Sequence, residues 1–305
     1  VQMNRMGYAC INMQLSNQKP RVYTGRSMIK RTFKSKGINY ASELGLQNCK
    51  DLLEIIKWNH ENGFNFFRIT SNLFPWCSEY KLSDMPDYDE ICDILSKAGR
   101  YAIDNDIRIT SHPGPFNVLT SPHEHVVENC INDLSIHGEV FDLMNLSRTP
   151  YNKINIHIGG AYGDKVSAME RFCENFHRLP DSVKTRLTVE NDDKATMYSV
   201  TDLYEGVYCK IGIPIVFDYH HHRFCDGGLS EEDALEVAIS TWGNIVPVVH
   251  YSESRNIEQE DDKIRPQAHS DYVRDYIDTY GNRVDIMVEA KHKELAVLKY
   301  KELHG

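Results

Sequence analysis

Residues 187–190, Leu-Thr-Val-Glu, form a short apolar run that ends on a carboxylate, and similar runs recur along the chain. Eight of them end on, or just before, a polar residue, and stretches with helical periodicity lie between them. The runs are Met6–Asn12, Phe66–Ser71, Ile107–His112, Ile154–His157, Leu187–Glu190, Ile215–Asp218, Val246–His250 and Val284–Glu289. Eight alternating strands and helices predict an α/β fold, a single (β/α)₈ TIM barrel.

The chain has 305 residues, which suffices for one such barrel, and no linker divides it, so we expect one domain over residues 1–305. Ser230 is the expected N-cap of one of its helices. The helical patterns cover Leu46–Asn62, Asp87–Asn105, Pro122–Leu146, Gly163–Arg178, Val200–Cys209, Glu231–Thr241, Ser270–Tyr280 and Lys291–Tyr300.

Six of the runs finish on side chains that bind metal ions: His112, His157, Glu190, Asp218, His250 and Glu289. The active site of a TIM barrel lies at the carboxyl ends of its strands, so closure would bring these side chains together. His221, three residues after Asp218, and His269, at the start of a predicted helix, complete the candidate set. Transition metals favour imidazole and carboxylate ligands, and Glu190 and Glu289 could bridge two ions. We predict a polynuclear metal site with Glu190, Glu289, His250 and Asp218 as its catalytic residues.

Charge is distributed unevenly along the chain. The formal net charge is −10, yet the first 42 residues contain no Asp or Glu. We therefore expect a basic loop after the first strand, at about residues 16–42, on the active-site face, where it would suit a phosphate-bearing substrate. The basic residues of this segment are Lys19, Arg21, Arg26, Lys30, Arg31, Lys34 and Lys36.

Other features bear on the class of protein. No run of about 18 apolar residues supports a membrane span, and Asn12 and Gln14 interrupt the apolar stretch near the first residue, unlike a signal peptide. The eight cysteines include no Cys-x-x-Cys pair, which favours reduced thiols over disulfides or a cysteine-bound zinc. We expect an intracellular protein with no membrane association and no obligate protein partner.

Two or three closely spaced divalent ions suit one reaction in particular. They lower the pKa of water and stabilise charge on the leaving oxygen of an in-line displacement, as phosphodiester hydrolysis requires. Sugar isomerisation, in which two ions polarise adjacent oxygens, is the alternative that the ligand set leaves open.

Longer segments of the chain resemble the UV damage endonuclease family, over nearly the whole length. No single segment is specific, but jointly they are. They are 7–12 (GYACIN), 67–75 (FRITSNLFP), 111–114 (SHPG), 157–160 (HIGG), 187–193 (LTVENDD), 218–221 (DYHH), 250–252 (HYS), 268–272 (AHSDY) and 287–291 (MVEAK).

The resemblance implies an enzyme that nicks damaged double-stranded DNA 5′ to UV photoproducts, cyclobutane dimers and 6-4 photoproducts, and leaves 3′-hydroxyl and 5′-phosphate ends. It implies up to three Mn²⁺ or Zn²⁺ ions held by the eight residues above, and a lesion that is flipped out of the duplex. Such an enzyme would be located wherever the DNA is. The side chains expected to contact DNA are Tyr8, Asn12, Arg68, Pro115, Phe116 and Lys291.

Three positions depart from the family pattern. Pro115 and Phe116 stand where we expect a Gln and an aromatic residue in the probe loop, so an amide contact to DNA is missing while a stacking ring remains. Val248 replaces a lysine that can be modified and assist the metals. Glu79 is the nearest counterpart of a further metal-binding histidine and is included as a candidate ligand.

Three other functions remain open at this point. An apurinic/apyrimidinic endonuclease like endonuclease IV would share the barrel and a trinuclear site. A sugar isomerase or epimerase would share the barrel, but a free sugar needs no basic segment such as Lys19–Lys36. A damage sensor without catalysis is disfavoured by the complete ligand set.

Overall fold

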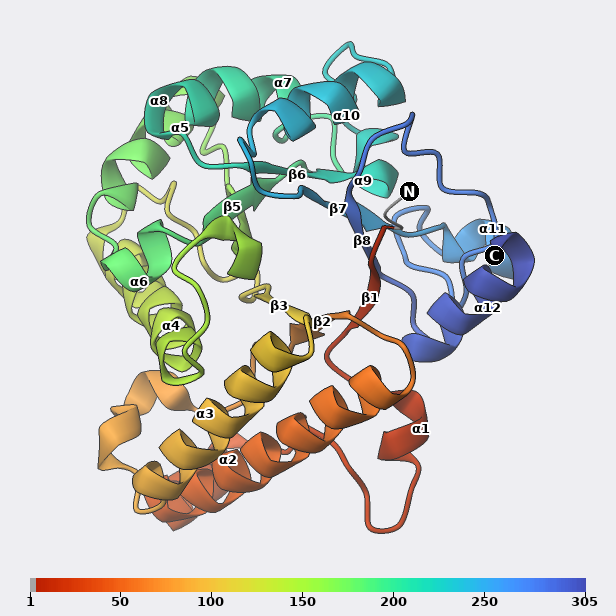
Figure 1. The fold of residues 1–305 in the computed structure, drawn as a ribbon. Helices are drawn as coiled ribbons and strands as arrows, with labels where there is room; N and C mark the ends of the chain where they lie inside the picture. The colour runs from red at the N-terminus through yellow and green to blue at the C-terminus, as the bar shows by residue number, and fades with distance from the viewer. Residues whose placement is uncertain (1–3) are drawn as a thin grey trace.

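The computed structural model describes residues 4–305, so the first three residues of the predicted domain lie outside it. Its centre is a closed barrel of eight parallel strands in sequential order, with helices around it (Figure 1). The predicted TIM barrel is confirmed. The strands are β1 Met6–Ala9, β2 Phe66–Ile69, β3 Arg108–Ser111, β4 Ile154–His157, β5 Leu187–Glu190, β6 Ile215–Asp218, β7 Val248–Tyr251 and β8 Asp285–Val288.

Pairing of the first strand with both its neighbours closes the barrel. In β1, Tyr8 is in register with Phe67 of β2, and Met6 with Ile286 of β8. Alternate side chains of a strand point to opposite faces, so every strand contributes to two buried regions. The larger apolar core packs the outer face of the barrel against the helices, and a smaller cluster, which includes Phe66, Val248 and Met287, fills the interior.

Helices follow the strands as the periodicity predicts, and most bounds agree to within a few residues. The Ser230 side chain accepts a hydrogen bond from the backbone N–H of Asp233, as expected of the N-cap. The helices are α1 Met13–Ser16, α2 Lys30–Glu61, α3 Tyr88–Asp104, α4 Glu124–Leu143, α5 Lys165–Phe176, α6 Asp181–Lys184, α7 Val200–Leu203, α8 Cys209–Ile211, α9 Tyr219–His222, α10 Glu231–Ser240, α11 Arg255–Gln259 and α12 Glu294–His304. No helix of the described residues is both long and apolar enough to cross a membrane.

The extent of the predicted basic loop, residues 16–42, is wrong. Helix α2 already begins at Lys30, and Gly37, with φ of 66°, marks a kink within it. The first turns of α2 are held because the Phe33 ring stacks on Trp76, with 5.7 Å between ring centroids. Lysine and arginine are good helix formers, so their charge alone did not indicate a loop. Four basic residues therefore project from a helix: Lys30, Arg31, Lys34 and Lys36.

The helix predicted over Ser270–Tyr280 is also wrong. That segment has no helix, and the helix of this connection is the short α11. Carboxylates take the backbone N–H groups that a helix would need: Glu258 accepts from Asp271 and Tyr272, and Glu253 accepts from Arg274. These bonds tie the segment to α11 in an extended path, which local periodicity could not reveal.

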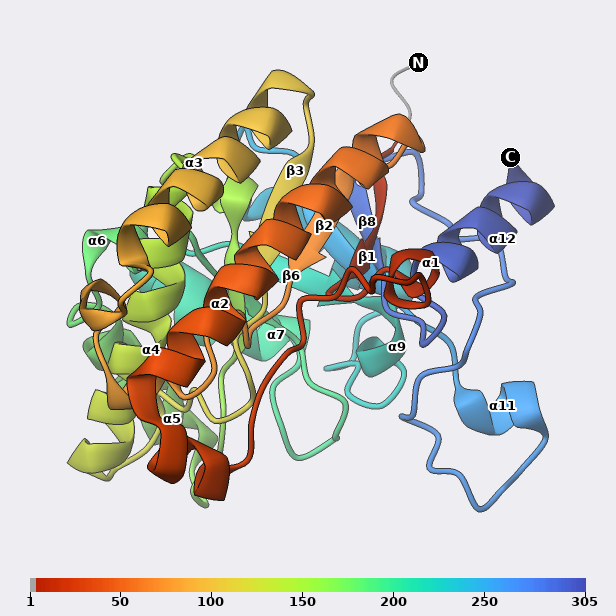
Figure 2. The same ribbon diagram turned by 90° about the horizontal axis from the view of Figure 1, so that it is seen from below.

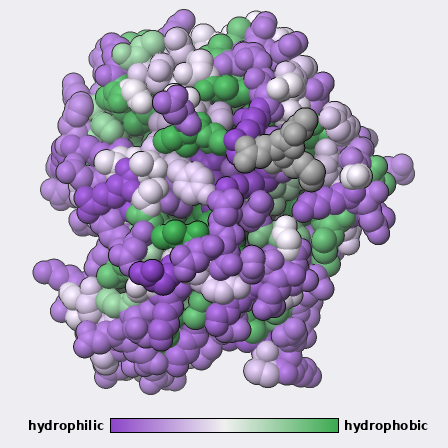
Figure 3. All heavy atoms as spheres, viewed as in Figure 1, coloured by the Kyte–Doolittle hydropathy of each residue, from purple (hydrophilic) through white to green (hydrophobic). Residues whose placement is uncertain are grey.

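The two ends of the barrel differ in what they carry. The strands end on the side where α9, α11 and the start of α2 lie, and both termini of the described chain lie on the other side (Figure 2). Figure 3 shows that other side, where apolar side chains are scattered among hydrophilic ones. The catalytic face of a TIM barrel is the side at which the strands end.

Candidate metal centre

Six of the predicted ligands meet where the strands end. The atoms that could bind metal form two overlapping groups, and within each group they lie within 4.8 Å of one another. One group is His112, His157 and Glu190, and the other is Glu190, Asp218, His250 and Glu289. Because Glu190 belongs to both and a carboxylate has two oxygens, it is positioned to bridge two ions.

Glu190 is the centre of the arrangement. Its Oε2 lies 3.2 Å from His157 Nε2 and its Oε1 lies 3.8 Å from His112 Nε2. His250 Nδ1 also contacts Oε1. Burial by itself would raise the pKa of Glu190, but His250 and His157 outweigh it and hold that pKa well below its usual range. The carboxylate is therefore ionised and available as a ligand.

Neighbouring oxygens orient three of the imidazoles. Nδ1 of His157 lies 2.8 Å from Asp192 Oδ1, and Nδ1 of His221 lies 2.8 Å from the carbonyl oxygen of Asn191. Nδ1 of His112 lies 3.1 Å from the carbonyl oxygen of Pro113. A hydrogen bond from Nδ1 to such an oxygen leaves Nε2 for a metal ion, the usual arrangement around metal-bound histidines.

The histidines differ in their protonation. Burial by itself lowers the pKa of His221, but Asp218 and Glu190 outweigh it and raise that pKa to about 9. Burial of His250 prevails over the same kind of carboxylate attraction and lowers its pKa to about 4. Ion binding must therefore displace a proton from His221, whereas His250 is already neutral at pH 7.

Unpaired buried atoms show that the residues fit divalent ions. Oδ2 of Asp218 and Nε2 of His250 are buried, and neither has a hydrogen-bond partner among residues 4–305. Burial raises the pKa of Asp218, and the attraction of His221 opposes this. Repulsion by Glu190 and Glu289 adds to the effect of burial, so the pKa of Asp218 lies well above its usual value. A cluster of carboxylate oxygens and imidazole nitrogens without hydrogen-bond partners is a set of ligands that suits divalent ions such as Mn²⁺ or Zn²⁺.

Three other predicted ligands lie outside the two groups. His221 is in α9, with Nδ1 3.5 Å from Asp218 Oδ2, so it borders them. His269 forms an isolated antiparallel bridge with Ser254 and shares a cavity with Glu289, although it does not begin a helix. Glu79 is exposed on the short 3₁₀-helix Cys77–Glu79, and the structure does not bring it to either group.

Two residues expected to contact DNA are buried instead. Tyr8 is 0% exposed in the outer core, where its hydroxyl donates to Asn59 and accepts from Asn12. Asn12 is also 0% exposed and caps α1 by accepting the backbone N–H of Leu15. In this structure neither side chain is exposed, and the bonds of both side chains serve the fold, so their expected contacts with DNA stay a prediction.

Phe116 and Pro115, by contrast, are exposed on the loop that follows His112. The Phe116 side chain is 89% exposed. Pro115 lines a cavity of about 400 Å³ that also includes His157, His221 and Met197. A large apolar ring thus projects into solvent next to a cavity that reaches the metal ligands.

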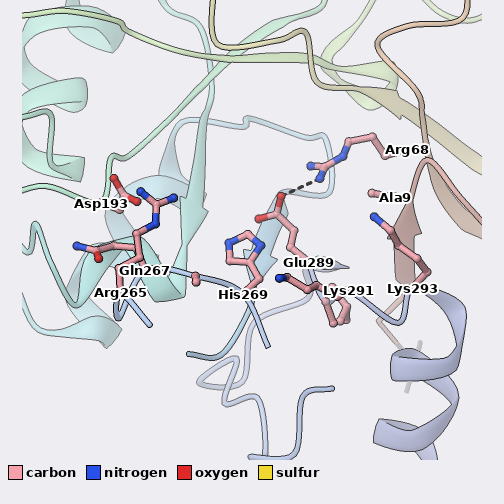
Figure 4. A pocket seen from close by; sticks show the side chains of 12 residues that line it. Ala9, Arg68, Asp193, Arg265, Gln267, His269, Glu289, Lys291 and Lys293 are labelled. Carbon is pink, nitrogen blue, oxygen red and sulfur yellow. Dashed lines mark hydrogen bonds and ion pairs between the residues drawn. The ribbon is translucent and has the colours of Figure 1, made fainter. Parts of the chain in front are cut away.

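A second cavity, of about 490 Å³, is lined by Glu289 and His269 and is basic (Figure 4). Arg68 lies in it and donates from Nη2 to Glu289 Oε2 at 2.7 Å. Lys291 also lines it and is exposed. Asp193 lines both cavities, so they adjoin at that residue, one reaching His157 and His221 and the other Glu289 and His269.

Several residues of the site were not predicted from the sequence. Asp192 and Asn191 orient imidazoles, and Lys293 lines the basic cavity. Lys153 is fully buried and its Nζ has no hydrogen-bond partner among residues 4–305; burial, followed by the charge of Arg68, lowers its pKa well below the usual value. Lys153 immediately precedes β4 in extended conformation and lies four residues before His157, so strand alternation could have indicated that both point to the same face.

Known proteins resemble the chain over most of its length. It is 36% identical to the UV-damage endonuclease of Schizosaccharomyces pombe, across 97% of this chain but 50% of that protein. It is 32% identical to a putative UV-damage endonuclease of Acanthamoeba polyphaga mimivirus, across 97% of this chain and 89% of that protein. The chain thus spans about half the length of the first of these relatives.

Solved structures agree with the fold. The crystal structure of SacUVDE superposes with a TM-score of 0.83 and 31% identity, over 98% of this chain and 97% of that one. D-psicose 3-epimerase from Clostridium cellulolyticum H10 superposes with a TM-score of 0.55 over 94% of this chain and 85% of that one. At 13% identity the epimerase shares the fold alone.

The family of the chain follows from the extent of these matches. The family model described as UV-endonuclease UvdE covers residues 4–304, which include all the strands and all the candidate metal ligands. The relatives at 30% identity or more match the same extent of the chain. This chain belongs to the UV-endonuclease UvdE family.

Proposed function

We propose that the chain is a metal-dependent DNA repair endonuclease that cuts the backbone 5′ to UV photoproducts. The observation that carries the proposal is the pair of metal-ligand groups joined by Glu190 at the barrel mouth. Membership in the UV-endonuclease family and the names of the relatives support DNA as the substrate. We further propose 3′-hydroxyl and 5′-phosphate products, and two or three Mn²⁺ or Zn²⁺ ions.

Each part of the site has a role in this reaction. Glu190, Asp218, His250 and Glu289, with His112 and His157, would hold the ions. Divalent ions there would supply Lewis acidity, which favours ionisation of water and neutralises charge on the phosphoryl oxygens. Asp192 and Asn191 fix the imidazoles through the hydrogen bonds described above, so little rearrangement is needed when the ions bind.

The exposed loop supplies the recognition of damage in this proposal. A dimer stacks poorly and costs less to extrude from the duplex than intact bases do. Phe116, almost fully exposed beside the cavity of about 400 Å³, can occupy the space that the extruded bases leave. Base stacking on an aromatic ring is worth about 1 to 3 kcal/mol, enough to offset part of the unstacking cost.

A nicking assay on one duplex, with and without a single cyclobutane dimer, tests the proposal. In Mn²⁺ we expect a nick immediately 5′ to the dimer, no nick on the undamaged duplex, and no activity in EDTA. Cleavage of a duplex with an abasic site but not of the dimer would instead assign an apurinic/apyrimidinic endonuclease. No cleavage of either duplex by metal-loaded protein would contradict both.

A further inference from the structure

The basic cavity of about 490 Å³ is lined by more cationic than anionic side chains. Four cationic side chains line it, and only two carboxylates, Asp193 and Glu289, do so. Glu289 already interacts with His250 and belongs to a metal-ligand group. The cations come from three separate parts of the chain: Arg68 from β2, Arg265 from the connection after α11, and Lys291 and Lys293 from the turn after β8.

Among residues 4–305, Arg68 pairs with Glu289 alone, and no ion pair is found for Arg265, Lys291 or Lys293. Arg68, whose side chain is only 10% exposed, uses Nη2 for Glu289, while its Nη1 is buried and has no hydrogen-bond partner among residues 4–305. Over the same residues, the structure gives neither ion pair nor hydrogen bond to the ammonium groups of Lys291 and Lys293. Figure 4 shows Arg68 and Lys293 on the same side of Glu289. A partly buried cavity with surplus cations of this kind favours an anion.

The backbone at Lys293 is strained. Its φ of 54° and ψ of −125° lie outside the regions that residues other than glycine normally adopt. The next residue, Glu294, is fully buried, and its carboxylate accepts the backbone N–H groups of Met13 and Gln14. Contacts to α1 therefore hold the turn that presents Lys293 to the cavity. Strain of this kind, maintained by surrounding contacts, is concentrated at functional sites.

We propose that Arg68 Nη1 and the Lys293 ammonium, with Lys291 at the rim, bind the DNA phosphate next to the one that is cut. The inference rests on the proposed function, because only a nucleic-acid strand presents a second phosphate one nucleotide away from the metal ions. The cavity begins at Glu289, a member of the metal-ligand group, so an adjacent phosphate of the same strand is within its reach. Guanidinium and ammonium donors are the side chains that bind phosphate oxygens most strongly.

The test uses the metal-loaded protein and a dimer-containing duplex in which one phosphate at a time is replaced by an uncharged methylphosphonate. Single-turnover nicking over a range of protein concentrations separates half-saturation from the maximal rate. In the wild type, one methylphosphonate beside the cut should raise the half-saturating concentration about tenfold. Lys293→Met should raise it equally on the unmodified duplex, and that methylphosphonate should then add nothing further.

Two variants serve as controls. Lys299→Met removes the same charge from an exposed position of α12 that pairs with Glu302, and it should leave half-saturation unchanged. Lys293→Gly relieves the positive φ, so it should raise the melting temperature and still show the about tenfold loss. The dependence of binding on salt should also weaken by about one unit of logarithmic slope for either Lys293 variant.

The inference would be overturned if Lys293→Met and each methylphosphonate raised the half-saturating concentration independently, so that their effects multiplied. It would also be overturned if both Lys293 variants left the half-saturating concentration unchanged. In those cases wild-type nicking 5′ to the dimer would leave the proposed function standing. A wild-type protein that neither binds nor nicks the dimer duplex would overturn the two together.

Discussion

Arg108 at one end of the barrel and Glu190 at the other are both buried charges, but their surroundings differ. All three guanidinium nitrogens of Arg108 have partners: carbonyl oxygens of Tyr151, Val246 and Pro150, and the Asp285 carboxylate at 2.9 Å. Around Glu190, buried atoms of Asp218 and His250 have no partner among the described residues. A completed network holds the fold together, whereas an incomplete one leaves positions for ions.

The largest effect should come from Glu190→Gln, which keeps the shape of the side chain and removes its charge. We expect nicking to fall by about 10³-fold or more, because Glu190 belongs to both metal-ligand groups and the reaction depends on the ions. Bound metal, measured on the purified protein, should fall with it while the circular dichroism spectrum stays that of a folded barrel. Glu258→Gln is the matched control outside both groups, and nicking within tenfold of wild type by Glu190→Gln would contradict the assignment.

Arg108→Met should have the largest effect on stability. It leaves the buried Asp285 carboxylate without its closest partner and removes the bonds to three carbonyl groups. Breaking a buried ion pair costs about 3 to 5 kcal/mol, to be measured by urea unfolding. Metal content per folded molecule should not change. If Arg108→Met lost its metal ions but kept its stability, the Arg108 network would be coupled to the metal-ligand groups, which would contradict the comparison.

Removal of the metal ions should make stability depend on pH. The folded-state pKa of His221 is raised to about 9 from an ordinary value of 6.5, so its contribution is complete below pH 6.5 and is lost as pH rises through 9. In EDTA the melting temperature should therefore decline over that window. Mn²⁺ at about 100 times its dissociation constant at pH 7 should add about 2.7 kcal/mol at that pH, and the same Mn²⁺ concentration should add more at higher pH, where His221 has lost its proton. A Mn²⁺ effect that does not vary with pH would contradict the protonation of His221.

Phe116→Ala should affect neither the Arg108 network nor the metal-ligand groups around Glu190. The ring is 89% exposed, so its loss should leave stability and metal content unchanged. Affinity for the dimer duplex, measured by fluorescence anisotropy, should weaken by about 1 to 3 kcal/mol, the value of a base stacked on an aromatic ring. Phe116→Tyr should retain that affinity. Equal binding by wild type and Phe116→Ala would exclude the ring from damage recognition.

The smallest effect should be that of Glu258→Gln, a carboxylate at the same face as Glu190 but with its bonds complete. Burial opposes its ionisation, yet the backbone N–H groups of Asp271 and Tyr272, together with Arg274, lower its pKa to about 2. Its stabilisation is present above the ordinary pKa of 4.5 and is lost as pH falls through 2. At pH 7 the substitution should cost about 1 to 2 kcal/mol. Urea unfolding should show a smaller difference at pH 3, and an equal difference at both pH values would contradict this.

Strand ends were predictable to different degrees. The runs that finish on His157, Glu190 and Asp218 match β4, β5 and β6, because short runs rich in β-branched residues between helical stretches are typical of buried parallel strands. Lys30 to Lys36 and Ser270 to Tyr280 were assigned wrongly. Their conformation depends on partners distant in the sequence, namely Trp76 for the former and Glu253 and Glu258 for the latter.

The candidate site shows the same division. Its ligands could be found because the topology of a barrel brings the ends of all eight strands to one face, whatever the details of packing. Tyr8 and Asn12 were placed beside the substrate from a sequence motif, although both are buried. The alternation of β1, which turns Tyr8 outward to the helices, is decided by the register with β2 and β8.

The barrel, the residues at its strand ends and the family could be inferred from the sequence, because each rests on local periodicity and residue type. Which buried charges have complete hydrogen bonds became known only from the folded arrangement. Arg108 and Arg68 are both arginines in interior positions of neighbouring strands, yet only the former has all its nitrogens bonded. Hydrogen-bond completion depends on groups from four or more separate segments, and no local pattern in the chain encodes their distances.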